Sequence, residues 1–444
     1  MKVLVISANS LPSAPSGPAY IAGVAFAAGH TVETFEALFA HDLEADLKQQ
    51  IKSFKPDVVA VSIRLVHAYM IDESAEHGTK HLDLRGRVKQ IVDCVRENSD
   101  AHIVLGGPGF NYYGLDWLEY LNLDYGIRGE AEFSFPQYLD ALQERGDIYR
   151  VPGCVYRENG HFVKVPREYV EDIDAAAYPA YQLFDLKLYA EHGISPAIVT
   201  KRGCEFNCTY CPYSELEGKR YRLKSSKRVV DEIEHIYKTG YPRMVTFCDN
   251  NFNVPNNHAL AVCQEIINRQ LDITWGTGTI KPLNVTGDAC RLYKESGCGY
   301  LGLSVESAST RMLKRMQRGC TVDDIRQSLI SLANSGIPFG ASLMFGAPGE
   351  TPETISETLS LMDEYHVPDG VWVTNGICLW TDRQQVLSDA RVDGQLDNDD
   401  QLFSGANYVS PQLPKTYMEE LVESLRAKDG YTVQVNKLYD DSNR

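Results

Sequence analysis

Residues 197–211 read AIVTKRGCEFNCTYC, an apolar run that leads directly into three cysteines spaced C-x3-C-x2-C. The run Ala197–Thr200 predicts a strand. Three thiolates so close in sequence converge only when the chain loops around one object, and a cubane iron–sulfur cluster with three cysteine ligands meets that demand. Cys204, Cys208 and Cys211 are therefore the predicted metal ligands, and they leave a fourth iron open.

Two other interpretations of the cysteines have to be weighed. A closed zinc site needs a fourth ligand, usually from another C-x2-C pair or from histidine, and the chain has no second such pair. Three buried structural cysteines that fall together by chance are the remaining alternative. The total of eleven cysteines is odd, which favours a reducing compartment over a disulfide framework.

Composition narrows the class of protein. The chain has 444 residues, enough for two or three domains, with 43% hydrophobic residues and a net charge of −17. Such an acidic chain is a poor general binder of nucleic acid. No stretch approaches the roughly 20 apolar residues of a membrane helix, and the opening MKVLVISANS resembles a strand more than a signal peptide. We expect a cytoplasmic protein.

The segment from residue 195 to 385 predicts six strand–helix units. Six units are too few for a closed eight-stranded barrel, but they suit a partial (β/α)6 TIM-like barrel with its chemistry at the carboxyl ends of the strands. The expected strands are Ala197–Thr200, Met244–Phe247, Ile273–Gly276, Tyr300–Val305, Phe339–Phe345 and Gly370–Ile377.

Residues 1–150 also alternate strands and helices, which predicts a parallel sheet in a doubly wound, flavodoxin-like (Rossmann-type) domain. The strands expected there are Lys2–Ile6, Val58–Ile63, Ile103–Leu105 and Tyr125–Arg128. Residues 151–194 are interpreted as a connector with a hairpin that turns at Asn159-Gly160. Residues 386–444 form a small C-terminal region with one helix near 416–428.

The cysteine motif after the first strand of a partial barrel resembles the signature of radical S-adenosylmethionine (SAM) enzymes. The resemblance covers roughly residues 195–385 and implies that the open iron binds the amino and carboxylate groups of SAM, which the cluster cleaves to a 5′-deoxyadenosyl radical. Tyr210 matches the family's aromatic beside the adenine. In the run GLSVES, the resemblance places Ser304, Glu306 and Ser307 at SAM's ribose and carboxylate, although Glu306 could also be a surface carboxylate.

Two further runs are less specific. GAPGET at 346–351 resembles the loop after the fifth strand of many members, but Pro348-Gly349 also makes an ordinary turn and Thr351 an ordinary helix cap. The polar run Cys248–Phe252 follows the second strand, where it suits substrate or SAM binding as well as a plain loop. No residue is clearly a general base; Tyr300, His366 and Asp382 are candidates by position only.

The N-terminal region resembles the cobalamin-binding domain that precedes many radical SAM barrels. The resemblance rests on the runs PDVVAVSIR (56–64), GGPGF (106–110) and DYGIRGEAE (124–132). It implies that cobalamin contacts Ser62, Arg64, Leu65, Gly106, Gly107, Pro108, Gly109, Phe110, Gly129 and Glu130. Glycines after strands also occur in plain flavodoxin-like domains. The D-x-H-x-x-G motif of other cobalamin proteins is absent, so Arg64, His67 or water could face cobalt.

Together the two resemblances imply a cobalamin-dependent radical SAM enzyme, class B methyltransferase-like. Such an enzyme moves a methyl group from methylcobalamin to an unactivated carbon, or a phosphorus, of a small molecule that is typically a natural-product intermediate. It uses two SAM molecules and an electron donor such as flavodoxin or ferredoxin. The alternatives are a cyclase or rearrangement enzyme with the same cofactors, a radical SAM enzyme with an empty N-terminal domain, and a cofactor-sensing binding protein without substrate chemistry.

Overall fold

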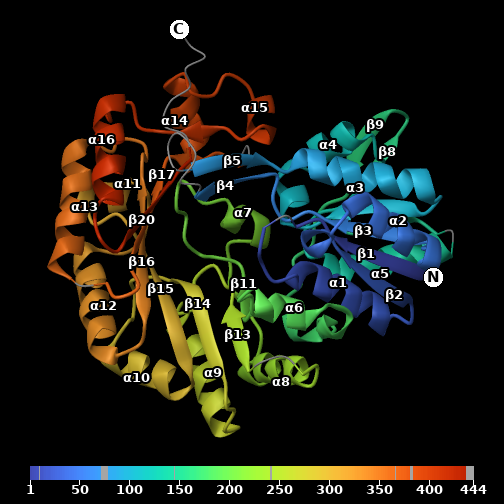
Figure 1. The fold of residues 1–444 in the computed structure, drawn as a ribbon, viewed down its shortest axis with the longest axis horizontal. Helices are drawn as coiled ribbons and strands as arrows, with labels where there is room; N and C mark the ends of the chain where they lie inside the picture. Colours follow the sequence, from blue (N-terminus) through green and yellow to red (C-terminus); the bar gives the residue numbers. More distant parts are fainter. Residues whose placement is uncertain are drawn as a thin grey trace. The chain divides into compact units, whose positions relative to one another are not determined.

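The computed structural model describes residues 1–9, 11–71, 79–144, 146–240, 243–365, 367–380 and 384–436. The chain forms two compact units, each built around a seven-stranded sheet (Figure 1). The first unit comprises residues 1–67, 83–197 and 231–242, and the second comprises 68–82, 198–230 and 243–444. The predicted α/β class is confirmed.

The first unit is a doubly wound sheet. Its strands, in sheet order, are β2 (Thr31–Glu36), β1 (Lys2–Ser7), β3 (Val58–Ser62), β6 (His102–Gly106), β7 (Tyr125–Ile127), β8 (Cys154–Glu158) and β9 (His161–Lys164). The first five run parallel, and β8 and β9 are antiparallel additions. The chain leaves β1 first toward β2 and then toward β3, so the carboxyl ends of β1 and β3 form a topological switch point.

Helices cover both faces of this sheet (Figure 1). The helices are α1 (Ser16–Ala27), α2 (Leu43–Phe54), α3 (Arg85–Asn98), α4 (Pro108–Leu121) and α5 (Ala131–Gln143). Alternate strand residues such as Val3 and Val5 join one core with α1 and α5. Their neighbours Leu4 and Ile6 are equally buried on the other face of the sheet, as a parallel sheet covered on both sides requires.

Three features of the first unit differ from the sequence prediction. Strand β2 and helix α2 were not predicted, because the run TVETFE is mostly polar and only Val32 and Phe35 are buried. The hairpin β8–β9 turns at Asn159-Gly160 as predicted, with positive φ at both residues, but it extends the sheet instead of leaving it as a connector. Helix α4 begins at Pro108, so the last three residues of the run GGPGF are helical, which the sequence did not predict.

The second unit is an open, all-parallel sheet. In sheet order its strands are β10 (Ala197–Ile198), β13 (Met244–Phe247), β14 (Thr274–Ile280), β15 (Cys298–Glu306), β16 (Phe339–Phe345), β17 (Val371–Asn375) and β20 (Tyr431–Val435). The six predicted strands are present. The seventh, β20, was not predicted; it pairs in parallel with β17.

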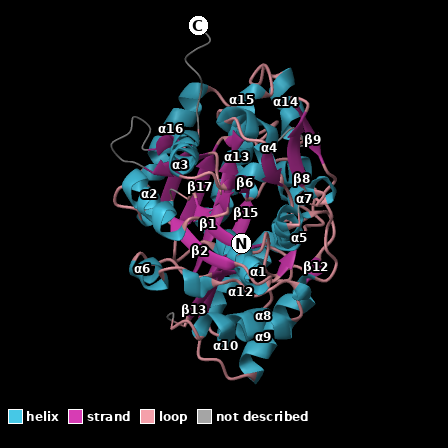
Figure 2. Ribbon diagram, turned by 90° about the vertical axis from the view of Figure 1, so that its right-hand side faces the viewer, coloured by secondary structure: helices cyan, strands magenta, loops and turns pink. Residues whose placement is uncertain are grey.

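Helices pack on one face of this second sheet (Figure 1); Figure 2 shows the helices and strands coloured by type in a view turned by 90°. They are α9 (Asn256–Asn268), α10 (Gly287–Glu295), α12 (Val322–Ser335), α13 (Pro352–Glu364) and α16 (Lys415–Arg426). Leu301, Leu303 and Val305 point to these helices and are fully buried. The residues between them point to the inner face of the partial barrel. None of the helices in the described part of the chain combines the length and apolar character that spanning a bilayer requires.

Candidate functional site

The three cysteines lie in a loop that is closed at its base. Strand β11 (Lys201–Arg202) pairs antiparallel with β12 (Arg222–Leu223), which brings the two ends of segment 203–221 together. Gly203 has a φ of 85°, and a Cβ there would lie 2.1 Å from the carbonyl oxygen of Arg220. Only glycine therefore fits this close approach. Within the loop, the amide of Cys204 donates to the carbonyl of Gly218 (3.0 Å) and that of Cys211 to Cys208 (3.1 Å).

The polar run after β13 fixes the start of this loop. The Asp249 carboxylate accepts hydrogen bonds from the Thr200 amide (2.7 Å) and hydroxyl (2.6 Å) and forms an ion pair with Lys201 Nζ (3.0 Å). The Lys201 and Asp249 side chains are 2% and 0% exposed, so the charges are fully desolvated and depend on each other. The strand end that carries the cysteine loop is thereby held in place.

The next residues of the run contact the loop itself. Asn250 Nδ2 donates to Glu217 Oε2 (2.8 Å), while Asn251 Nδ2 lies 3.6 Å from Cys204 Sγ and its Oδ1 accepts from Tyr221 (3.1 Å). An amide next to a thiolate sulfur stabilises its negative charge. The sequence did not decide whether the run Cys248–Phe252 is a ligand site or a plain loop. In the structure, its side chains support the cysteine loop.

Arg318 borders the cysteine loop on its other side. It is buried, and its Nη1 donates to Tyr210 Oη (2.8 Å) and lies 4.0 Å from Cys208 Sγ. Its Nη2 donates to the carbonyl of Ser304 at the end of β15. One guanidinium thus joins the cysteine loop to the fourth barrel strand. Sequence reasoning missed Arg318, because the run MQRGC at 316–320 has no pattern that separates it from a surface turn.

Glu306 ends strand β15 in a left-handed conformation, with a φ of 64° that is uncommon for a residue with a side chain. Such strain persists where surrounding structure enforces it, and it is often found at functional sites. Burial raises the pKa of the Glu306 carboxyl, while the nearby charges of Arg318 and Lys281 act in the opposite direction. The carboxylate therefore lies at the carboxyl end of the strand under the influence of two nearby cations.

Ser304 and Ser307 have different surroundings. Ser304 lies on the inner face of the sheet, and its carbonyl accepts from Arg318. Ser307 is fully buried, and its hydroxyl pairs with Thr358 Oγ1 (3.1 Å) and accepts from the Ser309 amide (3.2 Å). The Ser307 hydroxyl thus packs the strand end against α13 through Thr358, and the SAM contact that the resemblance implies stays a prediction.

Lys281 adds a second cation near the thiols. It is buried, and its Nζ lies 3.7 Å from the centre of the Phe206 ring inside the cysteine loop. Burial, and then the charge of Arg318, lowers the pKa of the Lys281 ammonium, and the thiols Cys208 and Cys204 act against this. Burial also raises the pKa of the Cys211 thiol to about 12. Two buried cations therefore face a site whose ligands must become thiolates when metal binds.

These donors fit an iron–sulfur cluster. The three thiols share one preformed loop, and each ligand of a cubane binds a different iron, so the sulfurs need not meet at one point. Across the described part of the chain, no set of three His, Cys, Asp or Glu side chains is close enough to hold a single metal ion. Arg318 and Lys281 supply positive charge for an anionic cluster and a carboxylate ligand.

The GAPGE loop after β16 is organised around a buried carboxyl group. Glu350 Oε2 accepts hydrogen bonds from the amides of Gly346 and Ala347, and the hydroxyl of Ser410 donates to the Glu350 carbonyl (2.9 Å). Burial raises the pKa of Glu350 to about 8. Thr351 caps helix α13 through a capping box, as predicted. The Glu350 side chain thus binds backbone amides of its own loop.

The carboxyl ends of β1, β3 and β6 meet at the switch point of the first unit. The Ala8 amide donates to the Ser62 carbonyl (3.1 Å), and the Ile63 amide donates to Gly106 (2.8 Å), so the ends of β1, β3 and β6 lie together. A Cβ on Gly107 would lie 2.5 Å from the Ile63 carbonyl oxygen and 3.0 Å from Ser62 Oγ. Glycine at 107 thus allows this close approach, and the Ser62 hydroxyl lies beside it.

The other predicted cobalamin residues separate into two groups. Arg64, Leu65, Gly106, Gly107, Pro108 and Gly129 are exposed or half-exposed along this edge of the sheet. Gly109, Phe110 and Glu130 are buried: the Phe110 ring fills the space above Gly126, and Glu130 accepts from the Val170 amide (3.1 Å). These three shape the domain from inside. His67, considered as a cobalt ligand, is also buried, at 2% exposure, whereas Arg64 is exposed.

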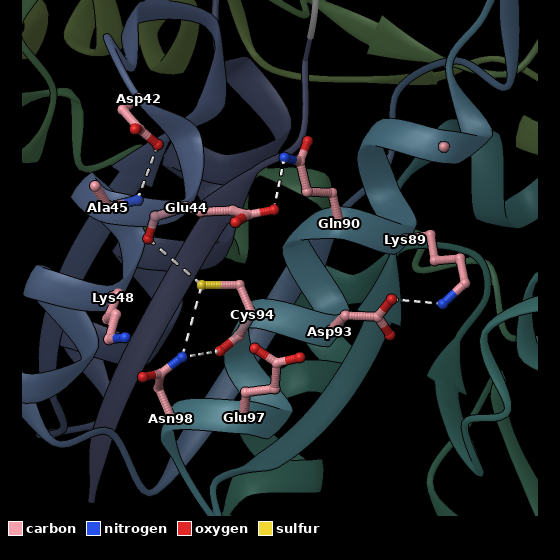
Figure 3. Close-up of a pocket in the computed structure, with 11 residues that line it drawn as sticks. Asp42, Glu44, Ala45, Lys48, Lys89, Gln90, Asp93, Cys94, Glu97 and Asn98 are labelled. Atoms are coloured by element: carbon pink, nitrogen blue, oxygen red, sulfur yellow. Dashed lines mark hydrogen bonds and ion pairs between the residues drawn. The ribbon is translucent and has the colours of Figure 1, made fainter.

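A further hollow does not have the features of a cofactor site. A hollow of about 610 Å³ between α2 and α3 is lined by four carboxylates and two lysines (Figure 3). Its groups bind one another, as in the Lys89–Asp93 ion pair (2.5 Å), and it lies along helix flanks instead of strand ends. Of the general-base candidates, His366 and Asp382 lie outside the described residues.

Comparison with known families agrees with this geometry. Residues 198–362 match the Radical SAM superfamily, and residues 1–139 match the B12 binding domain. The chain belongs to the cobalamin-dependent radical SAM enzymes. Its cofactors are accordingly a [4Fe–4S] cluster, SAM and cobalamin, as the resemblance implied.

Three similar proteins place this chain within the family. An uncharacterized methyltransferase of Pyrococcus horikoshii is 29% identical, over 78% of this chain and 72% of its own length. An anaerobic magnesium-protoporphyrin IX monomethyl ester cyclase of Rubrivivax gelatinosus is 26% identical, over 84% and 66%. The structure of the radical SAM methyltransferase TsrM from Kitasatospora setae, with cobalamin and a [4Fe–4S] cluster bound, covers 93% of this chain and 84% of its own, at 21% identity and a TM-score of 0.77. The last similarity shows a shared fold.

Proposed function

We propose that this enzyme is a methyltransferase that methylates an unactivated carbon, or a phosphorus, of a small molecule. The observation that carries the proposal is the preformed loop of Cys204, Cys208 and Cys211, bordered by Arg318, on a chain that also has a cobalamin-binding domain. When bound, the cofactors supply an electron, a cleavable sulfonium and a transferable methyl group, and the protein supplies position and charge.

The second unit supplies the groups that hold the cluster and SAM. Cys204, Cys208 and Cys211 ligate three irons. Tyr210, oriented by its hydrogen bond from Arg318, borders the adenine, and Ser304 and Glu306 hold the polar groups of SAM. Arg318 joins this set because it is a buried cation 4.0 Å from Cys208 Sγ. The carboxylate of SAM requires such a positively charged partner. Ser307 stays a predicted SAM contact, and its hydroxyl also pairs with Thr358.

The first unit supplies the cobalamin site. Ser62 at the switch point binds the nucleotide tail of cobalamin. The glycines at 106, 107 and 129 let this tail approach the backbone. Arg64 and Leu65 face the corrin because they point outward from the strand end, and Pro108 lies beside them at the start of α4. Gly109, Phe110 and Glu130 support these residues from within the domain.

Related proteins support methyl transfer and keep one rival open. The names of the Pyrococcus relative and of TsrM describe methyltransferases, whereas the Rubrivivax relative is a cyclase. Product mass separates the two outcomes, because methylation adds one carbon and one more SAM is consumed per turnover. An external one-electron donor such as flavodoxin or ferredoxin completes the reaction. None of the eleven cysteines forms a disulfide, which supports a reducing compartment such as the cytoplasm.

The test is anaerobic reconstitution with iron, sulfide and cobalamin, followed by incubation with SAM and a one-electron reductant. The expected result is iron and sulfide in equal amounts, a cobalamin absorbance spectrum, and release of 5′-deoxyadenosine. Cys208→Ala should lose the iron and the SAM cleavage but keep cobalamin, whereas Cys290→Ala, in helix α10, should keep all three. Protein that binds cobalamin but neither takes up iron nor cleaves SAM would instead be a cofactor-sensing protein.

A further inference from the structure

The inner face of the second sheet has an unusual floor made of glycine. Gly278, Gly302 and Gly340 lie on three neighbouring strands, β14, β15 and β16, and Gly302 pairs in register with Gly340. A Cβ on Gly302 would lie 2.3 Å from the Gly278 carbonyl oxygen, whereas a Cβ on Gly278 would have nothing within 4 Å. Open space therefore lies over Gly278, where a ligand can approach the backbone closely, while the Gly278 carbonyl covers Gly302.

A hollow of about 260 Å³ lies over this floor, and two aromatic side chains stand in it. Tyr300 is 40% exposed and Trp372 is 44% exposed, which is unusual for large rings on a sheet face. The Tyr300 phenol crosses to the neighbouring strands, since a Cβ on Gly340 would lie 2.7 Å from its hydroxyl oxygen. Glycine at 340 thus makes room for the ring, which forms one side of the hollow.

The charge of the hollow has one sign. Asp369 is the charged residue among those that line it, and the described lining includes no lysine, arginine or histidine. Burial, and then the charge of Asp369, raises the pKa of Tyr300, so this carboxylate acts at the phenol end of the hollow. The faces of tyrosine and tryptophan rings attract cations, and a carboxylate does the same. Both kinds of group therefore favour the same ligand charge.

The hollow lies toward the amino ends of β15, β16 and β17, on the same sheet face as Ser304, which lies nearer the carboxyl end. Ser304, whose carbonyl binds Arg318, is two residues beyond Gly302 on the same strand and points to the same side. Two residues of a strand span about 7 Å. A molecule anchored over Gly278, beside Gly302, can thus extend one substituent toward Arg318 and Cys208 without leaving the inner face.

We propose that this hollow binds the anchoring end of the substrate, and that this end is a flat group bearing a cationic nitrogen, as in an arylalkylamine or a protonated N-heterocycle. The flat group lies on the glycine floor between Tyr300 and Trp372, and the nitrogen faces Asp369. This inference rests on the proposed function, since it names the substrate class of the same barrel. It assigns specificity to residues outside the cysteine motif.

The test is binding of phenethylamine to the reconstituted full-length protein, measured by saturation-transfer NMR and calorimetric titration. A ligand of this size should bind with a Kd on the order of 1 mM. The anion of 3-phenylpropionic acid, which has a similar shape, should not compete. Asp369→Asn should weaken phenethylamine binding about tenfold and Trp372→Ala about three- to tenfold.

Gly278→Val places a Cβ where no protein atom lies within 4 Å, so its side chain enters the hollow and should abolish phenethylamine binding. Two matched controls lie elsewhere: Gly287→Val adds the same atoms in open space, and Asp323→Asn removes an exposed charge (89% exposed). Both should bind phenethylamine like the parent protein. Absence of saturable binding, equal binding of 3-phenylpropionate, or unchanged affinity in Asp369→Asn and Gly278→Val would each overturn the inference. Iron content and SAM cleavage, measured on the same preparations, report separately on the proposed function.

Discussion

Replacing Asp249 with alanine should destabilise the second unit and prevent iron uptake together. The substitution removes the partner of Lys201, whose side chain is 2% exposed, and it leaves the Thr200 amide and hydroxyl without their acceptor. Breaking a buried ion pair in this way costs about 3–5 kcal/mol. For a unit of this size, such a loss lowers the melting temperature on the order of 10 °C.

The assay is thermal unfolding of the metal-free protein under reductant, followed by iron analysis after reconstitution. Asp272→Ala is the control, because it breaks an ion pair with Arg243 whose side chains are 63% and 92% exposed, and such pairs contribute at most about 1 kcal/mol. Adding Lys201→Met to Asp249→Ala removes the stranded cation and should restore part of the loss. Equal melting temperatures for Asp249→Ala and Asp272→Ala, or no recovery in the double variant, would refute the reasoning.

Three more predictions concern single residues. Burial raises the pKa of Glu350 from 4.5 to about 8, so burying this carboxyl group opposes folding more strongly as pH rises between these values. The melting temperature of Glu350→Gln should therefore rise relative to that of the parent protein from pH 5 to pH 8. A constant difference across that range would contradict this. Gly107→Ala places a Cβ 2.5 Å from the Ile63 carbonyl oxygen, so it should lower the free energy of unfolding by about 2 kcal/mol or more and reduce the absorbance of retained cobalamin. In the control Gly160→Ala, the residue also has positive φ but its Cβ enters open space, so the loss of stability should be smaller and cobalamin should be kept. Arg318→Leu removes a cation 4.0 Å from Cys208 Sγ and should lower the cluster's midpoint potential on the order of 50–100 mV in an EPR redox titration, whereas Arg318→Lys should recover most of the shift.

The parts of the fold and site that the sequence predicted are those that depend on neighbours along the chain. The cysteine spacing lies within eight residues, and the helix at 322–335 has both a capping box and a regular apolar face. Both are therefore visible in a short window. The same holds for the Asn159-Gly160 turn, where local backbone preference decides the structure.

What the sequence did not predict depends on contacts between distant residues. Arg318 acts through Tyr210, which precedes it by 108 residues, and Asp249 acts through Thr200 and Lys201, 49 and 48 residues earlier. No local pattern marks such pairs. Strand β20 was missed because its apolar residues Val433 and Val435 follow a segment with weak patterning, and its parallel pairing with β17 decides its structure.

The ladder between β11 and β12 has a consequence for the lifetime of the enzyme. In a zinc finger the metal folds the chain, so loss of the metal unfolds it. Here backbone pairing, Gly203 and the Asp249 carboxylate hold the base of the loop in addition to any bound cluster. A cluster destroyed by oxygen should therefore leave an intact receptor behind, and anaerobic repair with iron and sulfide should succeed on folded protein with no need for denaturation.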